Sequence, residues 1–512
     1  MGDKFLKVAT VHMDVEYGNP KRNLDLLIWL CRSAAALGAK LICAPEMCLT
    51  GYVYHSPGAI MPMAESAKGP AIEALTQVAV ECQAFLVLGL AEKDDKTGIL
   101  YNSAFALSPS GQIVCHYRKI NAESRWASPG PPAQDNVFLT PWGAMGILIC
   151  SDSYHALLPR VTALKGASLL LLPTNWPISE SGFPLSLFRL RAEENGLWIL
   201  AANRGGQEEE IDFSKARSFL VDPLGHLSRG TSSGVDHRVR AYELPLNSDG
   251  VIEDRRVDAL ANRQPEQYHR LYGDFSRIKN FTGYLGLPKP GYLDVHALAP
   301  GRVHPLDFLE KVLDIFSPGS LVLMPQHDYG EEQLRQINRL AKKAQIGIFT
   351  AKTAQTGSHV AQTRFVAARQ YGVRVKSNIS QWPVYDSGTA RLMLAELESL
   401  RHPELALAAA KDGVDLILCP SAVDFSKDEA LMLTLRPIEQ VAIAAASPNL
   451  ALISLIPQGH GAGRGTTALS GQVATYTVDT RLTRQKTFQD RVDFETVFSE
   501  PILGTPWLRL HP

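Results

Sequence analysis

The sequence predicts an α/β fold in which one type of domain occurs twice along the 512-residue chain. In the first half, short apolar runs alternate with amphipathic stretches, a pattern typical of sheets covered by helices. A polar segment rich in arginine, glycine and proline follows at residues 251–291 and indicates a domain end and a linker. The same order of elements then returns. We therefore expect related domains at residues 1–272 and 290–512, joined by a linker at residues 273–289.

The expected elements of the first half mix crossover helices with hairpins, which predicts a mixed sheet with helices packed outside it. The helix at residues 19–38 has Pro20 near its start and Gly38 at its end. A hairpin turns at SPSG, residues 108–111. We expect further helices at residues 69–83, 158–167 and 185–196, and strands at residues 7–13, 39–46, 84–92, 100–107, 111–119, 145–150, 168–174, 197–206, 216–225 and 239–246.

The second half repeats this order segment by segment. YLDVHALA, residues 292–299, corresponds to the first strand, and LVLMPQ, residues 321–326, corresponds to LICAPE. GVDLILCPS, residues 413–421, likewise corresponds to GASLLLLPT, residues 166–174. Because the period is too long for a solenoid, two copies of one domain explain the matches better.

The composition argues against several classes of protein. Formal net charge is −1, and lysine and arginine do not gather with aromatic residues, so we expect neither nucleic acid nor an anionic membrane as a main partner. No apolar run approaches the roughly 18 residues of a membrane-spanning helix. The seven cysteines are an odd set, several lie in apolar runs, and the first residues do not resemble a signal peptide. We therefore expect a cytoplasmic protein with reduced thiols.

Three reactive side chains follow apolar strands of the first half. Glu46 ends LICAPE, Lys119 ends IVCHYRK and Cys150 ends GILIC. Catalytic groups commonly collect at strand ends in sheet-based folds. Their chemistry is coherent, because a carboxylate can take the proton of a thiol and a lysine can stabilise an oxyanion.

Each of these residues also has a purely structural interpretation. A cysteine at a strand end is more often an inert packing residue. A glutamate after a proline is usually a solvated turn residue, and Tyr-Arg-Lys is usually a charged strand terminus. The residues indicate catalysis only when they are taken together, in this order and spacing.

In this combination the first half resembles the nitrilase superfamily of carbon–nitrogen hydrolases over nearly all of residues 5–272. The resemblance rests on the segments APEMCLTGY, LYNSAFAL, YRK, ESRWASPG, GILICSD, LLLLPTNWP, RAEENGLWILAANRGG and RQPEQYHRL. It implies an αββα sandwich. The second half resembles the same family more weakly over roughly residues 290–505, so the resemblance implies two αββα sandwiches in tandem.

The resemblance also implies a covalent mechanism. The family's catalytic glutamate, lysine and cysteine correspond to Glu46, Lys119 and Cys150, and its second glutamate corresponds to Glu123. Glu46 would take the thiol proton and Cys150 would attack the amide carbonyl. Lys119 and the backbone N–H of Ser151 would hold the oxyanion. Glu46 would then protonate the leaving amine and activate the water that hydrolyses the thioester, while Glu123 positions Glu46 and Lys119.

The resemblance defines the substrate-binding residues less sharply. Ser151-Asp152 follows the cysteine where nitrile-cleaving members often carry Trp-Glu, which favours the amidase branches. Asn175 and Trp176 lie in a segment that often lines the family's pocket, although Trp176 is equally a candidate core aromatic. Tyr54 is a further candidate for substrate binding, and the histidine after it is more often structural.

The second half keeps the family's framework but lacks its chemistry. Gln326, Ser380 and Leu397 stand at the positions of the glutamate, lysine and cysteine. An amide cannot serve as a general base and a leucine cannot be a nucleophile. Cys419 belongs to a core strand. We therefore expect residues 290–512 to be catalytically inactive and to pack on the first domain as an intramolecular pseudodimer, with the binding of a regulator as a rival role.

The sequence thus predicts a Cys-dependent hydrolase of a non-peptide amide or carbamoyl C–N bond. Three alternatives stay open: a nitrilase that forms a thioimidate on the same cysteine, an N-acyltransferase that passes the thioester to an amine, and a catalytically idle binding scaffold. The expected ligand is a small amide, carbamoyl compound or nitrile, and further homo-oligomerisation is left open. We expect no metal or organic cofactor, because zinc-type spacing, a P-loop and a dinucleotide fingerprint are all absent from the sequence.

Overall fold

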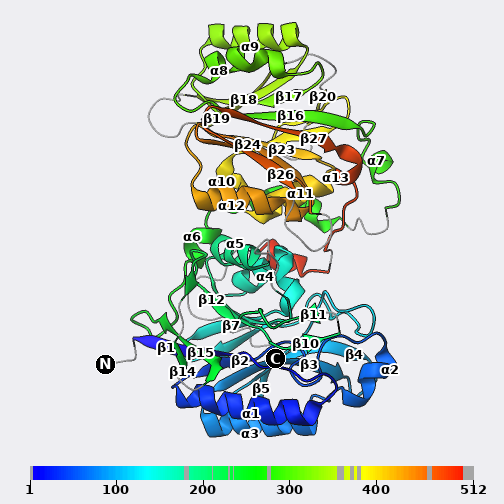
Figure 1. Cartoon of the computed structure of the whole chain (residues 1–512), viewed down its shortest axis with the longest axis vertical. Helices are drawn as coiled ribbons and strands as arrows, with labels where there is room; N and C mark the ends of the chain where they lie inside the picture. Colours follow the sequence, from blue (N-terminus) through cyan, green and yellow to red (C-terminus); the bar gives the residue numbers. More distant parts are fainter. Residues whose placement is uncertain are drawn as a thin grey trace. The chain divides into compact units, whose positions relative to one another are not determined.

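In the computed structural model of this protein, the described residues are 4–177, 184–209, 211–228, 231–233, 236–273, 278–354, 362–368, 374–376, 382–457, 464–489 and 491–499. The chain forms two compact units (Figure 1). The first comprises Met1–Arg263 and the C-terminal residues from Arg491, and the second comprises Gln264–Asp490. These boundaries differ from the expected ones, because the segment expected as a linker lies within the second unit and the end of the chain belongs to the first.

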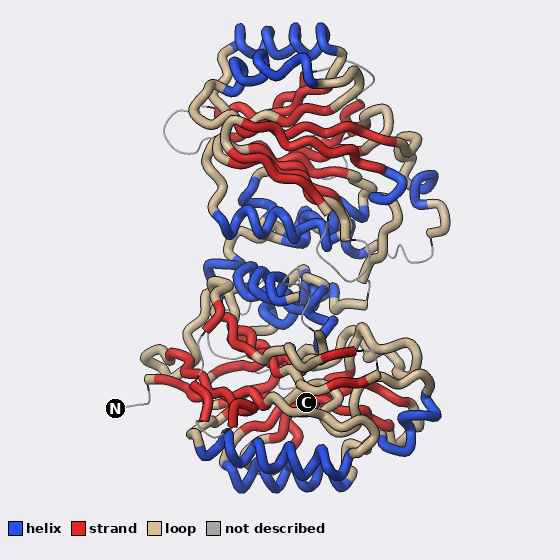
Figure 2. Tube along the Cα trace, in the orientation of Figure 1, coloured by secondary structure: helices blue, strands red, loops and turns tan. Residues whose placement is uncertain are grey.

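The first unit contains two sheets packed face to face, with helices on both outer sides (Figure 2). Its seven-stranded sheet has the order β14-β15-β1-β2-β3-β4-β5. β2 pairs in parallel with both β1 and β3, and the other pairs are antiparallel. The strands are β1 (Phe5–Val11), β2 (Leu41–Cys43), β3 (Phe85–Lys93), β4 (Leu100–Leu107), β5 (Ile113–Arg118), β14 (Thr231–Ser233) and β15 (Asp236–Pro245).

The second sheet of this unit has the order β13-β12-β9-β8-β7-β6, with β7, β8 and β9 parallel. The strands are β6 (Val137–Thr140), β7 (Gly143–Ile147), β8 (Ala167–Pro173), β9 (Trp198–Ala202), β12 (Phe219–Val221) and β13 (Leu227–Ser228); β10 (Gln207–Glu208) and β11 (Ile211–Asp212) form a separate hairpin. The helices are α1 (Pro20–Ala36), α2 (Pro57–Ile60), α3 (Pro70–Cys82), α4 (Leu157–Leu164), α5 (Leu185–Asn195) and α6 (Arg256–Leu260). The predicted αββα sandwich is therefore confirmed.

Helix α1 shows how the sequence pattern fixes the packing. Pro20 occupies its first turn, and the side chain of Asn19 accepts a hydrogen bond from the backbone N–H of Arg22 at 3.3 Å. Its buried apolar residues recur every three or four positions and pack with the sheet core: Leu27, Leu30, Cys31 and Ala34. The helix therefore begins and ends within two residues of the range expected from the sequence.

The second unit repeats the strand order of the first. Its sheets have the orders β19-β18-β17-β16-β27 and β20-β21-β22-β23-β24-β25-β26. Strands β15-β1-β2-β3-β4 correspond to β27-β16-β17-β18-β19, with the same parallel and antiparallel pairs. Strands β12-β9-β8-β7-β6 correspond in the same way to β25-β24-β23-β22-β21. One sandwich topology thus accounts for both units.

The strands of the second unit are β16 (Tyr292–Ala299), β17 (Leu321–Leu323), β18 (Gly347–Ala354), β19 (Gln362–Ala368), β20 (Arg374–Lys376), β21 (Val384–Asp386), β22 (Arg391–Leu394), β23 (Leu416–Pro420), β24 (Ala442–Ala446), β25 (Leu450–Ser454), β26 (Gly465–Leu469) and β27 (Gln472–Asp479). Its helices are α7 (Phe281–Tyr284), α8 (Pro305–Val312), α9 (Glu331–Ala344), α10 (Leu397–Leu400), α11 (Pro403–Lys411), α12 (Lys427–Leu435) and α13 (Thr480–Thr483). Within the ranges given above, no helix is both long and apolar enough to cross a membrane.

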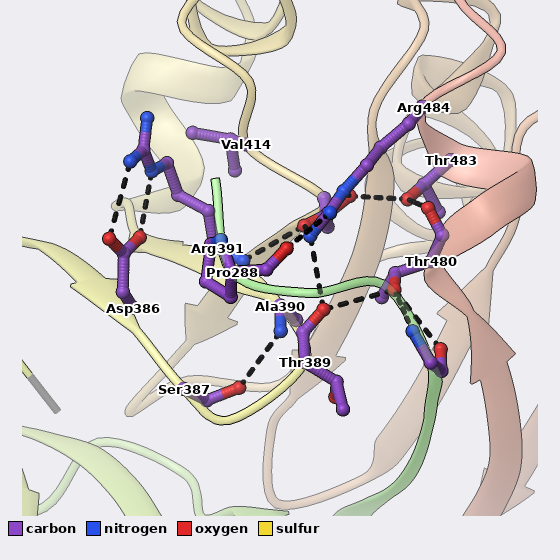
Figure 3. Close-up of polar contacts among 12 residues, drawn as sticks. Pro288, Asp386, Ser387, Thr389, Ala390, Arg391, Val414, Thr480, Thr483 and Arg484 are labelled. Atoms are coloured by element: carbon purple, nitrogen blue, oxygen red, sulfur yellow. Dashed lines mark hydrogen bonds and ion pairs between the residues drawn. The ribbon is translucent and has the colours of Figure 1, made fainter. Parts of the chain in front are cut away.

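The segment expected as a linker is held to the second unit by buried cations. The guanidinium of Arg484 pairs with Asp415 at 2.9 Å and donates to the carbonyl oxygens of Pro288 at 2.6 Å and Thr389 at 3.0 Å (Figure 3). The ammonium of Lys411 donates to the carbonyl oxygen of Leu271, just before the expected linker, and to that of Gly273, at its start. Backbone fixed in this way is part of a domain, since a free linker makes few such contacts.

The end of the chain packs on the first unit. Its last described helix, α14 (Phe494–Val497), contacts α4. The guanidinium of Arg263 donates to the backbone oxygens of Val497 at 2.5 Å and Ser499 at 3.3 Å. Arg491 donates to the carbonyl oxygen of Gly130 at 2.9 Å. Residues 491–499 therefore complete the first unit although the whole second unit precedes them.

Replacing Arg263 by methionine keeps the apolar stem and removes both contacts with the chain end. We expect amide hydrogen exchange in residues 491–499 to become about ten- to a hundredfold faster, because hydrogen bonds from a charged donor contribute about 1.5–3 kcal/mol. Mass spectrometry of exchanged peptides measures this. The exposed Arg335→Met variant in α9 of the second unit is the control, and unchanged exchange in Arg263→Met would contradict the assignment of the chain end.

Candidate active site

The first candidate residue, Glu46, is fixed at the end of β2 by a close approach of two backbones. Its side chain is fully buried. A Cβ atom on Gly89 of β3 would lie 2.7 Å from the Cα of Glu46, so only glycine allows the strands to pass here. The N–H of Gly89 donates to the carbonyl of Pro45 at 3.1 Å and holds the turn in place. The glutamate is therefore an interior residue and not a solvated turn.

Lys119 follows β5 and lies between two carboxylates. Its ammonium is 2.7 Å from Oε1 of Glu46 and 2.5 Å from Oε1 of Glu123. All three side chains are at least nine-tenths buried. The structure thus brings together the glutamate, the lysine and the second glutamate that the sequence singled out, as a network of charge-assisted hydrogen bonds.

Two neutral residues complete this network, and neither was found from the sequence. The amide of Asn102, in β4, donates to Glu46 at 2.8 Å and to Glu123 at 2.9 Å. The hydroxyl of Tyr52 donates to Glu123 at 2.9 Å. The signal for Asn102 was an amide inside the apolar run LYNSAFAL, because a buried amide requires hydrogen-bond partners.

Cys150 lies at the start of a short 3₁₀ turn, Cys150–Tyr154, three residues after β7 ends. Its φ angle is +46°, in the left-handed region that a residue with a Cβ adopts at a cost of about 1–3 kcal/mol. Such strain is typical of functional turns. The thiol is buried, the backbone N–H of Asn175 faces its sulfur, and the charges of Glu46 and Lys119 act on it.

Asp152 ties the cysteine turn to the lysine segment. Its buried carboxylate accepts hydrogen bonds from the hydroxyl of Tyr117 and the backbone N–H of Asn121, both at 2.7 Å. These contacts fix the residues on either side of Lys119 relative to Cys150. Asp152, the acid that the sequence analysis associated with the amidase branches, is therefore hydrogen-bonded to a residue of β5.

The pKa values follow from burial and from the shared lysine. Burial raises the pKa of Glu46 to about 7, against the opposing effect of Lys119. At Glu123, Lys119 and the hydrogen bond from Asn102 outweigh burial and lower the pKa. Burial alone would lower the pKa of Lys119, but the two carboxylates raise it well above its usual value. Burial raises the pKa of the Cys150 thiol, so the resting site holds a protonated thiol beside a carboxylate that titrates near neutral pH.

The candidate substrate-binding residues differ in their surroundings. Tyr54 is buried; its hydroxyl donates to the carbonyl of Thr50 at 2.6 Å and its ring stacks on Tyr17. Trp176 packs on Phe188, with ring centroids 4.7 Å apart. Substrate binding by these two residues therefore stays a prediction, made for side chains that already have packing partners.

Asn175 and Ser151 lie nearer to the thiol. The side chain of Asn175 is buried, and neither of its amide atoms has a hydrogen bond among the residues the structure describes. Ser151 follows the cysteine in the same turn, and its hydroxyl contacts the carbonyl of Asn121 at 3.4 Å. Within the described ranges, no three His, Cys, Asp or Glu side chains gather in a way that could hold a metal ion.

The second unit places different residues at the corresponding points. Gln326 follows β17 by three residues, the same offset by which the candidate glutamate follows β2. Leu397 follows β22 by three residues, as Cys150 follows β7. Ser380 lies outside the described residues. Cys419 lies inside β23, where burial raises the pKa of its thiol, and the group is an inert core residue in this unit.

About half of this chain is similar in sequence to known proteins. A family model described as carbon–nitrogen hydrolase matches residues 7–239. A nitrilase from Pyrococcus abyssi is 30% identical over 272 residues, which cover 52% of this chain and 100% of that protein. Deaminated glutathione amidase from Homo sapiens is 29% identical over 268 residues, which cover 49% of this chain and 80% of that protein. An amidase crystal structure from Nesterenkonia sp. is 26% identical, covers 51% of this chain and 97% of its own, and has a TM-score of 0.42.

Replacing Asn102 by aspartate would place a third carboxyl group between Glu46 and Glu123. The pKa of the introduced carboxyl group would be higher in the folded state than its unfolded value of about 3.9. The variant therefore keeps its stability at low pH and loses stability as the pH rises through this folded-state pKa. We expect the free energy of unfolding to fall by about 3 kcal/mol at pH 8 relative to wild type, and by less at pH 5.5. Denaturant unfolding at both pH values measures this, with the exposed Asn247→Asp variant as a control; an equal loss at both pH values would count against the network.

Proposed function

Because this chain belongs to the carbon–nitrogen hydrolase family of the nitrilase superfamily, we propose that its first unit hydrolyses a non-peptide amide or carbamoyl C–N bond through a thioester on Cys150. The observation that carries the proposal is the buried Lys119, held between Glu46 and Glu123 and acting on the strained Cys150. A binding scaffold has no need of a buried lysine that bridges two carboxylates beside a strained cysteine, because each buried charge costs several kcal/mol to desolvate.

In the acylation step, Glu46 is the general base and Cys150 the nucleophile. Oε2 of Glu46 makes no hydrogen bond within the described part of the chain, so it is available for the thiol proton. As that proton moves to Glu46, the sulfur attacks the carbonyl carbon and the carbonyl oxygen becomes an oxyanion. Lys119 and the backbone N–H of Ser151 stabilise this oxyanion. Glu46 then returns the proton to the leaving nitrogen as the C–N bond breaks.

The deacylation step uses the same carboxylate. Glu46 takes a proton from water as the water oxygen attacks the thioester carbon, and it returns that proton to the sulfur when the C–S bond breaks. The group must accept and release protons at each turnover, which is efficient for a base whose pKa lies near the working pH. Its pKa of about 7 suits that role.

A nitrilase is the second candidate function, because one relative that is matched over its whole length carries that name. In this case the sulfur of Cys150 would add to the nitrile carbon and form a thioimidate in place of the tetrahedral adduct. The amidase proposal is favoured by the relatives named deaminated glutathione amidase and omega-amidase.

We further propose that the second unit is catalytically silent. Gln326 cannot accept a proton as Glu46 can, and Leu397 offers no nucleophile. If this is so, the loss of Cys150 removes the hydrolysis, because the second unit cannot replace it.

Brief exposure to a panel of amides, carbamoyl compounds and nitriles should leave an acyl mass on the Cys150 peptide. Mass spectrometry detects the adduct, and an ammonia assay measures turnover. We expect Cys150→Ala to lose activity by at least about a thousandfold. Ammonia from nitriles alone would favour the nitrilase, transfer to hydroxylamine would favour an acyltransferase, and equal behaviour of wild type and Cys150→Ala would favour the scaffold.

The proposed base also predicts a pH dependence. Glu46 must be deprotonated to accept the thiol proton, so activity falls as pH drops below the pKa of about 7. We expect the acid limb of kcat/KM to have its midpoint near pH 7, and Glu46→Gln to be inactive across the range. A midpoint near 4.5, the value of an ordinary glutamate, would show that burial does not tune this group.

A further inference from the structure

A buried ion pair outside the site described so far touches the segment that carries Tyr52. Arg204 and Glu208 pair with each other, and both side chains are fully buried. Oε2 of Glu208 accepts hydrogen bonds from the backbone N–H of Tyr52 at 2.8 Å and of Val53 at 3.0 Å. We propose that Glu208 is a positioning residue for Glu123, which it holds in place through Tyr52; this inference rests on the proposed function.

The pair is itself held rigidly. Arg204 donates to the backbone oxygens of Val15 at 2.6 Å and Gly205 at 3.0 Å, and its guanidinium lies over the ring of Phe213. Glu208 belongs to the hairpin of β10 and β11. A carboxylate fixed by a buried arginine has few alternative positions, because moving it would leave the arginine charge unpaired.

The fit between Glu208 and the tyrosine segment requires a glycine. Gly51 has φ +87°, and a Cβ atom there would lie 2.6 Å from Oε1 of Glu208. The carboxylate therefore occupies the space that a side chain at position 51 would fill. This close approach brings it to the two backbone N–H groups that follow, and it fixes the direction in which Tyr52 leaves the loop.

The other end of Tyr52 touches the proposed machinery. Its hydroxyl donates to Oε1 of Glu123, the same oxygen that contacts Lys119. The titratable groups around Glu123 are Lys119, Glu46, Cys150 and Tyr52 itself, and Asn102 adds a neutral donor. A donor on Glu123 favours its charged form and leaves Glu46 as the carboxylate that takes the thiol proton.

A second contact of the same hairpin supplies a matched control. Glu209, the residue next to Glu208, pairs at the surface with His55 at 2.9 Å. Arg125 approaches the other ring nitrogen of His55 at 3.5 Å. Since Glu209 does not touch Tyr52 in the described contacts, its loss should not alter Glu123.

The test follows alkylation of Cys150 by iodoacetamide between pH 5 and 9, read at the Cys150 peptide by mass spectrometry, which requires no substrate. Tyr52→Phe removes only the hydroxyl, and Glu208→Gln removes the charge that holds the loop. Glu46 and Glu123 titrate as an interacting pair, so a donor lost from Glu123 raises the apparent pKa at which the pair takes up a proton. We therefore expect both variants to move the acid limb of the alkylation rate upward by about one pH unit. Glu209→Gln should keep the wild-type limb.

The proposal is overturned if Tyr52→Phe keeps the wild-type limb, or if folded Glu208→Gln does. Circular dichroism checks folding, and if Glu208→Gln does not fold, the paired Arg204→Met and Glu208→Gln double variant, which leaves no unpaired charge, takes its place under the same criterion. Glu46→Gln separates the two hypotheses. If the alkylation rate of Glu46→Gln falls at the same acidic pH as that of wild type, Glu46 is not the base. The proposed function is then refuted, whatever the other variants show.

Discussion

The candidate active site of the first unit depends on one buried cation, Lys119. Lys119 lies against two carboxylates, Glu46 and Glu123, so the cluster carries one more negative charge than positive. A lone buried carboxylate would protonate, and a lone buried lysine would lose its proton. Together they stay charged, and the surplus negative charge is shared through donors from Asn102 and Tyr52. That surplus, with burial, explains why one carboxylate titrates near neutrality while the other does not.

The packing of the two sheets of the first unit brings together the strand ends that carry the candidate residues. Glu46 follows β2, Asn102 lies in β4 and Lys119 follows β5, all from one sheet, whereas Cys150 follows β7 of the other. Side chains from both sheets meet because the sheets pack face to face. Asp152 then joins the cysteine turn to β5. In the second unit, the neutral residues Gln326 and Leu397 lie three positions after the corresponding strands, and the sandwich is retained around them.

The sequence predicted the candidate nucleophile, base and lysine because reactive residues follow apolar runs in an order and spacing that resemble the nitrilase superfamily. It did not predict Asn102 or Tyr52, whose partners lie 56 and 71 positions away and depend on the fold. The domain boundaries differed for a further reason. Arg263 and Arg484 hold their segments largely through backbone oxygens, which every residue has and which leave no trace in the sequence. The order of strands and helices along the chain, by contrast, could be predicted from the alternation of apolar runs and amphipathic stretches in the sequence.

The return of residues 491–499 to the first unit matters for how the protein is made. A chain leaves the ribosome from its N-terminal end at about 5–20 residues per second. The whole of Gln264–Asp490 is therefore synthesised between the body of the first unit and its last segment, a delay on the order of tens of seconds. A nascent chain therefore cannot complete its first unit before the second unit has been synthesised. A chain truncated anywhere in Gln264–Asp490 has a first unit that lacks residues 491–499, so synthesis of the second unit is a condition for a complete first unit.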